Sequence, residues 1–364
     1  MKQIKIFWFP HGPRNPYQYL LIDRLKAFGL NIELADTRYF FFCNITILTI
    51  LRKNWKPDII HLHWHHSSLV TLSKFKSIVK STIFLFQIYL LKLLNIKLVW
   101  TIHNLTHHED RHKPIELFFC RFLGNSADAI ITHCEKAQVE VARVFKIRET
   151  NKIHVIPHGN FINFYENKIS KENSQKQLRL SEPIFNFLFL GEIRPYKGIK
   201  ELISAFKKVD NTAHQSIGLI IAGRPKNVEF AVEIKKLIKG NKNIYLVLKY
   251  ISDNEIQTYL KVADIVVFPY RNVFTSGGIL LAMSFGKPII APRLGCVVDV
   301  LDQSGSYLYD PMHSNELYKT MKNAIFEKSR HSKMGSHNLN LAKRFDWINI
   351  ARATKDLYLD LLKI

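Results

Sequence analysis

Residues 187–206 read FLFLGEIRPYKGIKELISAF, and this stretch turns from an apolar strand directly into a helix. Residues 186–190 form a short apolar run of the kind found in buried strands, whereas the apolar residues at 199, 202, 203 and 206 repeat with the spacing of one helix face. Two glycines bound the turn between them, at residues 191–198. A strand that passes through a tight turn into a helix is the building unit of a parallel α/β sheet.

The same alternation of apolar runs and helical patterns continues along the chain. We predict further strands at residues 4–9, 58–63, 97–102, 129–132, 152–156, 217–222, 244–248, 265–268 and 288–291. The 364 residues exceed one average domain, so the length favours two cores. The sequence therefore predicts an α/β protein with two Rossmann-like domains.

The domain boundary is predicted from a polar stretch. Residues 166–182 (ENKISKENSQKQLRLSE) contain almost no large apolar side chains, so we expect a linker or solvated loop there. Residues 1–165 then form an N-terminal domain, and residues 183–345 form a C-terminal domain. Residues 346–364 are predicted to form a C-terminal helix that crosses back to the N-terminal domain.

The composition indicates a folded protein that is attracted to polyanions. The hydrophobic content is 47%, too high for a disordered chain, and 52 basic residues against 30 acidic ones give a formal net charge of +22. Nucleic acid and anionic membrane both fit this charge. The sequence shows no recognition helix, zinc finger or RNA-binding motif, so nucleic-acid binding remains the alternative and no nucleic-acid partner is predicted.

One segment predicts contact with a membrane surface. Residues 82–91 (TIFLFQIYLL) are followed by Lys92, and the run is shorter than the roughly 20 residues that span a bilayer. Residues 59–108 contain no acidic side chain, but they contain five lysines. We expect peripheral association with the inner leaflet, and a buried helix with solvated lysines is the alternative. The N-terminus MKQIKIFWFP resembles a first strand rather than a signal peptide, so a cytoplasmic location is expected.

Two loops of the second half have features of a phosphate site. Gly191 permits close backbone approach, and Arg194 and Lys197 are placed to neutralise a departing diphosphate, although a turn with solvated basic residues is the alternative. Residues 275–278, Thr-Ser-Gly-Gly, open an apolar helix after the strand at 265–268, and a helix N-terminus binds anions. Together the two loops predict a pocket for a nucleotide diphosphate.

The order GxxRxxKGxxxLIxAF, then AGR at residues 222–224, then SGGILLAMxxGKPIIAP resembles family 4 of the retaining GT-B glycosyltransferases, also called glycosyl transferases group 1. HGPRNPY, HLHWHH, VWTIHNLTHHE and IPHGN extend the resemblance over the first half. It implies two Rossmann-like domains facing across a cleft, with residues 1–165 as the acceptor-binding domain and residues 183–345 as the nucleotide-sugar-binding domain. It also implies transfer of a sugar, with retention of configuration, from a UDP- or GDP-sugar to a lipid-linked oligosaccharide or other glycan in surface polysaccharide biosynthesis. A GT-B relative with epimerase or phosphorylase activity is the second alternative.

The resemblance assigns site residues position by position. Lys197 matches the donor-phosphate lysine, and Arg194 replaces the arginine that the family has at Glu192. The glutamates of the family's E-x7-E motif fall at Val273 and Leu281, so the chain has an SGG variant of that motif. The predicted donor-binding residues are Gly12, Gly191, Arg194, Lys197, Gly223, Arg224, Tyr250, Ile251, Thr275, Ser276, Gly277 and Gly278.

The first half supplies the remaining predicted site residues. His103 matches the family's histidine near the transferred sugar and is predicted to be catalytic together with Arg194 and Lys197. Asn104 and His63 are predicted to bind the acceptor. His107, His108 and Glu109 share one loop without a fixed metal-ligand spacing, and the family generally needs no metal. We therefore expect no metal and no bound cofactor, only the nucleotide sugar as co-substrate.

Overall fold

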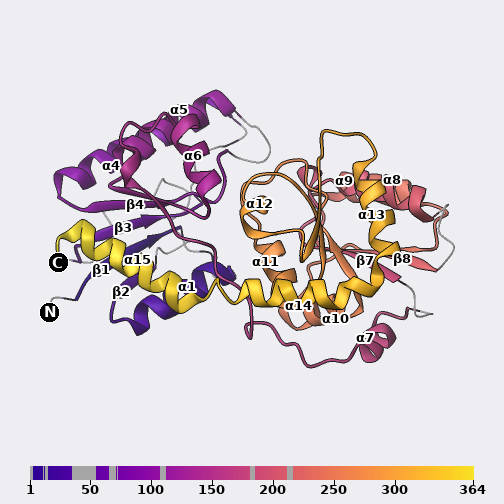
Figure 1. Ribbon diagram of the computed structural model, residues 1–364. Helices are drawn as coiled ribbons and strands as arrows, with labels where there is room; N and C mark the ends of the chain where they lie inside the picture. The colour runs from indigo at the N-terminus through magenta and orange to yellow at the C-terminus, as the bar shows by residue number, and fades with distance from the viewer. Residues whose placement is uncertain are drawn as a thin grey trace. The chain divides into compact units, whose positions relative to one another are not determined.

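The computed structural model describes residues 3–10, 12, 15–34, 55–64, 71, 73–106, 112–180, 185–210 and 216–364. The chain divides into two compact units (Figure 1). Unit 1 combines Met1–Gly159 with Asp346–Ile364, and unit 2 contains Asn160–Phe345. The C-terminal segment is therefore part of the same unit as the N-terminal half.

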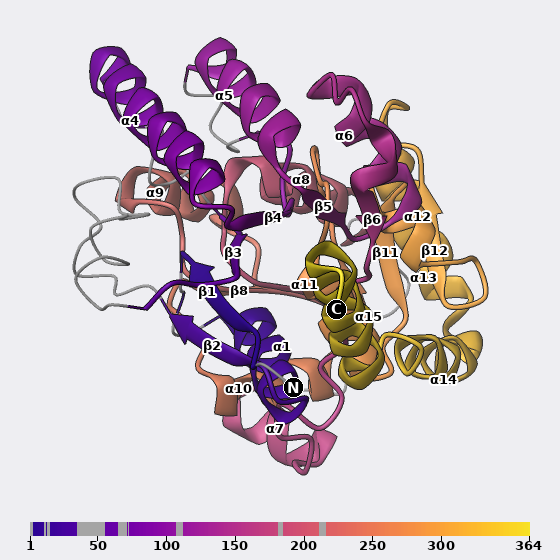
Figure 2. The same ribbon diagram turned by 90° about the vertical axis from the view of Figure 1, so that its left-hand side faces the viewer.

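Unit 1 is built on a six-stranded parallel sheet with the order β2-β1-β3-β4-β5-β6. The strands are β1 (Lys5–Phe9), β2 (Asn31–Leu34), β3 (Ile59–Leu62), β4 (Lys97–Thr101), β5 (Ala129–Thr132) and β6 (Ile153–Val155). The helices are α1 (Pro16–Ala27), α4 (Lys74–Leu93), α5 (Lys113–Ser126), α6 (Glu135–Val144) and α15 (Trp347–Leu362), with a 3-10 turn at Thr150–Lys152. Figure 2 shows α4, α5 and α6 on one face of the sheet and α1 and α15 on the other.

Strand alternation decides what each face of this sheet buries. Ile6, Trp8, Ile59, Val99 and Ile131 belong to one buried cluster with the apolar residues of α1 and α15. Side chains two residues apart on a strand point to the same face. The residues that continue these strands in steps of two therefore emerge on the α1 and α15 side, at the carboxyl ends of the strands.

Unit 2 contains the second six-stranded parallel sheet, with the order β12-β11-β10-β7-β8-β9. Its strands are β7 (Phe185–Leu190), β8 (Ile217–Ala222), β9 (Ile244–Val247), β10 (Ile265–Val267), β11 (Ile289–Pro292) and β12 (Ser306–Tyr309). Its helices are α7 (Lys171–Gln177), α8 (Ile199–Asp210), α9 (Val228–Ile238), α10 (Asp253–Val262), α11 (Gly277–Ser284), α12 (Val297–Val300), α13 (Glu316–Phe326) and α14 (His331–Ala342). Two 3-10 turns lie at Pro195–Lys197 and Lys328–Arg330. In Figures 1 and 2, α8, α9 and α13 cover one face, and α10, α11 and α14 cover the other.

The prediction of an α/β protein with two parallel sheets is confirmed, and the structure adds two strands to it. β2 and β12 are the edge strands of their sheets, and each is only partly buried. Their sequences, NIEL and SYLY, lack the continuous apolar run that marks a central parallel strand. Continuous apolar runs, which indicate the other strands, therefore do not indicate these two edge strands.

The structure of residues 166–182 differs from the linker or solvated loop that the sequence predicts. This segment lies inside unit 2 and contains α7, which packs against α10. Ser174 of α7 is fully buried, and Lys171 forms an ion pair with Asp264 at 2.6 Å. Polar side chains that make specific contacts explain why this packed segment looks like a linker in sequence.

Within the described residues, no helix combines the length and the apolar character needed to cross a bilayer.

Candidate functional site

Each sheet has a switch point at which the strand order reverses. β7 lies between β8 and β10 in unit 2, and β1 lies between β2 and β3 in unit 1. Open α/β sheets bind ligands beyond the carboxyl ends of the strands at such a point. In unit 2 this edge carries Lys197 and Ser276, and in unit 1 it carries Gly12 and His63. These four predicted residues therefore follow the strands that flank the two switch points.

Close backbone contacts explain the glycines beside β7. Gly198 has a φ of +71°, and a Cβ atom added to it would lie 1.8 Å from the carbonyl oxygen of Pro269. A Cβ atom added to Gly223 would lie 1.8 Å from the carbonyl oxygen of Gly191. The loops after β7, β8 and β10 can approach one another only because these positions lack side chains.

Lys197 is a poorly solvated cation at this edge. A Cβ atom added to Gly191 would lie 3.5 Å from Lys197 Nζ, so the ammonium group sits close to the Gly191 backbone. Burial lowers the pKa of Lys197 to about 8, and the charge of Glu192 opposes that change. An ammonium group that has lost part of its hydration gains more from pairing with an anion than an exposed lysine does.

Glu192 holds two arginines next to Lys197. Arg194 Nε lies 3.2 Å from Glu192 Oε2, and Arg224 Nη2 lies 3.1 Å from Oε1. Burial acts to raise the pKa of Glu192, but the Arg194 charge and the Arg224 hydrogen bond outweigh it, and the pKa lies below its ordinary value. This group contains three cationic side chains and one carboxylate, so its net charge is +2.

The start of α11 supplies a second feature for anions. Ser276 Oγ accepts the N–H of Ile279 at 3.3 Å and lies 3.1 Å from the Tyr270 hydroxyl. A Cβ atom added to Gly278 would lie 3.1 Å from Phe268 Cε1, so packing also favours glycine here. Because Thr275 to Gly278 are partly exposed and the first N–H groups of a helix lack partners within the helix, this end is suited to a phosphate.

The remaining predicted donor residues lie in two places. Tyr250 and Ile251 follow β9 in unit 2; Tyr250 is exposed and Ile251 is buried. Gly12 belongs to unit 1, whereas the other predicted donor residues belong to unit 2, and its N–H donates to Gln18 Oε1 at 2.6 Å. Gln18 Nε2 donates in turn to the carbonyl of Pro10 at 2.7 Å, so this buried glutamine holds the loop after β1.

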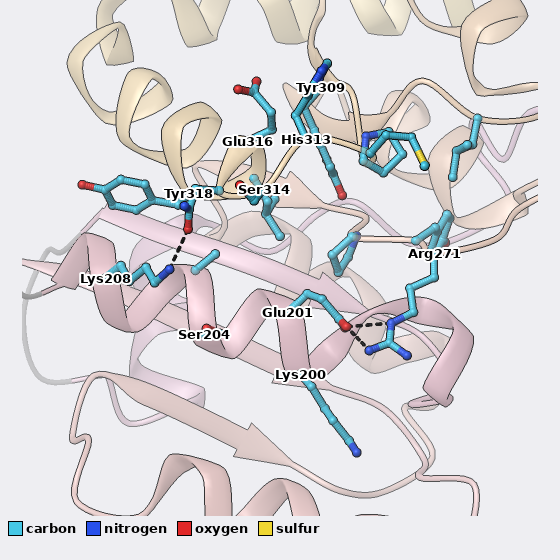
Figure 3. Close-up of a pocket in the computed structure, with 18 residues that line it drawn as sticks. Lys200, Glu201, Ser204, Lys208, Arg271, Tyr309, His313, Ser314, Glu316 and Tyr318 are labelled. Carbon is cyan, nitrogen blue, oxygen red and sulfur yellow. Dashed lines mark hydrogen bonds and ion pairs between the residues drawn. The ribbon is translucent and has the colours of Figure 1, made fainter.

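A pocket of about 580 Å³ opens between α8 and α13 (Figure 3). Figure 3 shows Arg271 paired with Glu201 on one side and Lys208 hydrogen-bonded on the other. None of the predicted donor-binding residues lines this pocket. It adjoins their loop, because Arg271 N donates to the carbonyl of Tyr196 at 2.9 Å.

At the carboxyl edge of unit 1, three imidazoles form a chain. His63, His103 and His133 continue β3, β4 and β5 in steps of two from Ile59, Val99 and Ala129, on the face of α1 and α15. His133 Nε2 lies 3.2 Å from His103 Nδ1, and His103 Nε2 lies 3.1 Å from His63 Nδ1. All three side chains are buried, and Trp64 stacks on His103 with ring centroids 3.8 Å apart.

One backbone carbonyl determines the proton positions in this chain. His133 Nδ1 lies 2.9 Å from the carbonyl oxygen of Ile156, which can only accept, so Nδ1 carries the proton. In a chain of neutral rings His133 Nε2 then accepts from His103 Nδ1, and His103 Nε2 accepts from His63 Nδ1. Burial lowers the pKa of His133 to about 4 and that of His63 well below its ordinary value, which keeps these two rings neutral.

This geometry specifies where the predicted catalytic histidine sits. Both ring nitrogens of His103 face other imidazoles, and Asn104, the next residue, is partly exposed. His133 was missed by the sequence analysis, although it follows the strand at 129–132 just as His103 follows its own strand. Tyr17 was also missed; its ring lies 4.9 Å from His103, and no sequence signal connects α1 to this edge.

A second buried histidine bridges β3 to the C-terminal helix. His61 Nε2 lies 2.7 Å from Thr101 Oγ1, and its Nδ1 lies 2.5 Å from the Tyr358 hydroxyl. In the ranges that the structure describes, no group of three or more His, Cys, Asp or Glu side chains is arranged to hold a metal ion. His107, His108 and Glu109 lie outside those ranges.

Comparison with known families and structures identifies the class. Residues 3–160 match Glycosyltransferase Family 4, and residues 170–339 match Glycosyl transferases group 1. Sucrose-phosphate synthase from Thermosynechococcus elongatus has the same fold, with a TM-score of 0.76 and 16% identity over all of both chains. HepE of Anabaena, solved with UDP-glucose, gives a TM-score of 0.73 and 17% identity over all of both chains. The protein is therefore a glycosyltransferase with the GT-B fold.

The chain thus combines an N-terminal domain that matches Glycosyltransferase Family 4 with a C-terminal domain that matches Glycosyl transferases group 1. GDP-mannose:glycolipid 4-beta-D-mannosyltransferase of Xanthomonas campestris pv. campestris is 24% identical over 97% of this chain and 90% of its own length. Lipopolysaccharide 1,2-N-acetylglucosaminetransferase of Salmonella typhimurium is 27% identical over 55% of this chain and 54% of its own length.

The buried histidines predict that acid destabilises unit 1. Burial lowers the pKa of His61 and His158 to about 3 and that of His133 to about 4. The unfolded chain takes up protons below its ordinary histidine pKa of about 6.5, whereas the folded chain does not, so stability is present above that pH and lost as the pH falls. Between pH 7.5 and 5.5 each histidine should contribute about 1.4 kcal/mol to the loss, or about 4 kcal/mol for the three.

Urea unfolding at the two pH values, followed by tryptophan fluorescence, measures this effect in unit 1, because all five tryptophans of the sequence lie there. His61→Gln should remove about 1.4 kcal/mol of the pH dependence. Tyr17→Phe is the control and should leave the pH dependence unchanged. A His61→Gln protein with the pH dependence of the wild type would show that folded His61 takes up a proton in this range.

Proposed function

We propose that the protein transfers a sugar from a UDP- or GDP-sugar to a lipid-linked oligosaccharide or another glycan acceptor. The observation that carries this proposal is the arrangement at the switch point of unit 2. Lys197, Arg194 and Arg224 gather on one loop pair, and the Ser276 end of α11 follows β10, the strand next to β7. Together they offer positive charge and N–H donors for a diphosphate.

Stabilisation of the leaving group is assigned to protein cations. When the bond from sugar to diphosphate breaks, negative charge grows on the diphosphate, and preorganised positive groups lower the energy of that state. Glu192 fixes the directions of two guanidinium groups before the nucleotide arrives, so less side-chain freedom is lost on binding. No bound metal or other cofactor is part of the proposal.

The acceptor class is proposed from the relatives and from unit 1. The Xanthomonas relative is named for a glycolipid acceptor, and the Salmonella relative is named for lipopolysaccharide. A role in surface polysaccharide assembly (capsule, O-antigen or exopolysaccharide) fits both names. Asn104 and His63, which follow neighbouring strands of unit 1, are proposed to contact the acceptor.

Peripheral attachment to the cytoplasmic face of the membrane is proposed from α4. One side of this helix buries Ser77, Ser81, Phe84, Ile88 and Leu91. The other side exposes a second apolar stripe, formed by Phe75, Ile78, Ile83, Phe86, Tyr89 and Leu93, and α5 adds exposed Phe118 and Phe122. Lysines accompany this stripe and acidic residues do not, which is the combination that binds anionic lipid surfaces.

Retention of configuration is also part of the proposal. Inversion by direct displacement needs a base for the acceptor hydroxyl. Glu192 is paired with two arginines and its pKa lies below the ordinary value, so it is a weak base. The Xanthomonas relative is named for a β-linked product, and such a product from an α-linked donor means inversion, so inversion is the specific alternative.

A panel of UDP, GDP, ADP and their sugars tests the donor site by thermal shift. One nucleotide series should stabilise the wild type, by about 2.7 kcal/mol at a hundred times its dissociation constant. Lys197→Ala should lose that response, because the ammonium group beside Gly191 is gone. Lys200→Ala, three residues away and paired with Glu233, is the matched control and should respond like the wild type. Stabilisation of Lys197→Ala equal to that of the wild type would contradict the assignment.

The configuration is tested without an acceptor. The nucleotide sugar identified by the panel is incubated with enzyme, and ¹H NMR follows the slow hydrolysis before the free sugar mutarotates. Retention predicts that the first-formed sugar has the anomeric configuration of the donor. The opposite anomer, appearing first, would show inversion and would support the alternative suggested by the Xanthomonas relative.

Vesicle flotation tests the membrane surface. The wild type should bind phosphatidylcholine vesicles that contain phosphatidylglycerol, and high salt or omission of the anionic lipid should weaken binding. Phe75→Ser, Phe86→Ser and Leu93→Ser combined should weaken binding by more than about tenfold, because three insertable apolar groups are lost. Phe326→Ser and Val228→Ser, which are exposed on α13 and α9, are the controls. Equal loss in both sets would mean that the α4 stripe is not the docking surface.

A further inference from the structure

Two buried polar atoms next to the switch point of unit 1 have no hydrogen-bond partner among the described residues. They are Trp8 Nε1, a donor on β1, and His63 Nε2, directly after β3. Trp8 is fully buried and His63 is 1% exposed. A buried polar atom without a partner destabilises the folded state, so the presence of two such atoms together requires an explanation.

The two side chains form one stack. β1 and β3 are hydrogen-bonded neighbours, and the rings of Trp8 and His63 stack with centroids 4.3 Å apart and an interplanar angle of 21°. An indole N–H can only donate. What His63 Nε2 can do depends on where the imidazole proton sits, and the imidazole chain settles that point.

The chain from the Ile156 carbonyl leaves His63 Nε2 with a lone pair. His133 and His103 pass the same proton arrangement along, so that the proton of His63 is on Nδ1, facing His103. Trp8 and His63 therefore present one donor and one acceptor. A hydroxyl group needs this combination, because it donates one hydrogen bond and accepts others.

We propose that Trp8 Nε1 and His63 Nε2 form a hydroxyl-binding subsite for the sugar acceptor, and that His103 and His133 are positioning residues that hold the proton of His63 on Nδ1. The assignment to the acceptor rests on the proposed transferase function. Trp8 is the second-last residue of β1 and His63 directly follows β3, so the subsite lies at the carboxyl ends of the two strands that flank the switch point, where ligands of open α/β sheets bind. One bound hydroxyl group would provide a hydrogen-bond partner for both Trp8 Nε1 and His63 Nε2.

The low basicity of the His63 imidazole fits a role in orienting the acceptor hydroxyl. Burial lowers the pKa of His63 well below its ordinary value, and the neighbouring imidazoles His61, His103 and His133 add to the effect. His63 therefore accepts a hydrogen bond from a hydroxyl without removing its proton. Holding the hydroxyl in one direction is the contribution expected from such a group.

The first test is the tautomer of each ring. Two-bond ¹H–¹⁵N spectra of uniformly ¹⁵N-labelled protein distinguish a proton on Nδ1 from one on Nε2. His63, His103 and His133 should all carry the proton on Nδ1, and single His→Gln variants assign the signals. His133→Gln removes the ring that fixes the chain and should release His63 to the other tautomer or to a mixture. A proton on His63 Nε2 in the wild type would overturn the proposal.

The second test uses methyl α-D-mannopyranoside and methyl α-D-glucopyranoside as hydroxyl probes. Adding at least one of them should shift the His63 Nε2 and Trp8 Nε1 resonances of the wild type. Trp8→Phe and His63→Phe, which each remove one of the two polar atoms, should weaken the response about tenfold, the effect of one lost hydrogen bond. Trp55→Phe, outside the stack, is the control.

Water is the competing source of an O–H group, and the same spectra separate the two. If neither glycoside moves the resonances and the His63 Nε2 shift already shows a hydrogen bond in buffer, a trapped water occupies the subsite and the acceptor assignment is wrong. Nucleotide binding by unit 2 is measured separately, so failure here leaves the donor site intact. Failure of the nucleotide panel would instead remove the transferase basis of the assignment.

Discussion

Parallel pairing places the carboxyl ends of all strands of a sheet at one edge, and both units depend on this constraint. In unit 2 it brings the loops after β7, β8 and β10 close enough that Gly198 and Gly223 must lack side chains. In unit 1 it aligns three strands that each continue, two residues at a time, from an apolar core into an imidazole. In each unit the candidate site residues therefore lie at or just beyond the carboxyl ends of strands whose other side chains belong to the core.

The glycines and charges of the donor loop have two roles at once. Gly223 is required by the backbone of Gly191, whatever ligand binds. The carboxylate of Glu192 by itself repels a diphosphate, yet it brings Arg194 and Arg224 together and leaves the cluster with a net positive charge. Val273, where the family resemblance predicts a glutamate, is buried and contributes to the apolar packing of this unit. Packing and the proposed donor binding therefore share this loop.

Much of the fold was readable from local patterns, because buried parallel strands are continuous apolar runs. The donor loop was readable for the same reason, since glycines and basic residues follow such runs directly. The edge strands β2 and β12 and the packed helix α7 were not, because partly buried elements lack that signal. The link from His61 to Tyr358 joins residues 297 positions apart, and no pattern along the chain encodes it.

The imidazole chain contains histidines that a contribution to folding stability does not explain. Apolar side chains in place of His63, His103 and His133 would pack the same sheet without desolvating ring nitrogens, and would remove the acid sensitivity that buried neutral histidines bring. A purely structural explanation accounts for His61, whose two nitrogens are both satisfied by hydroxyl groups. It does not account for His63, where the chain ends in a lone pair on a ring that stacks against Trp8, whose indole N–H also has no partner among the residues that the structure describes. A structural network would be expected to close on itself, whereas this one ends in an open donor and acceptor beside the switch point, which is the feature of a site prepared for a hydroxyl group.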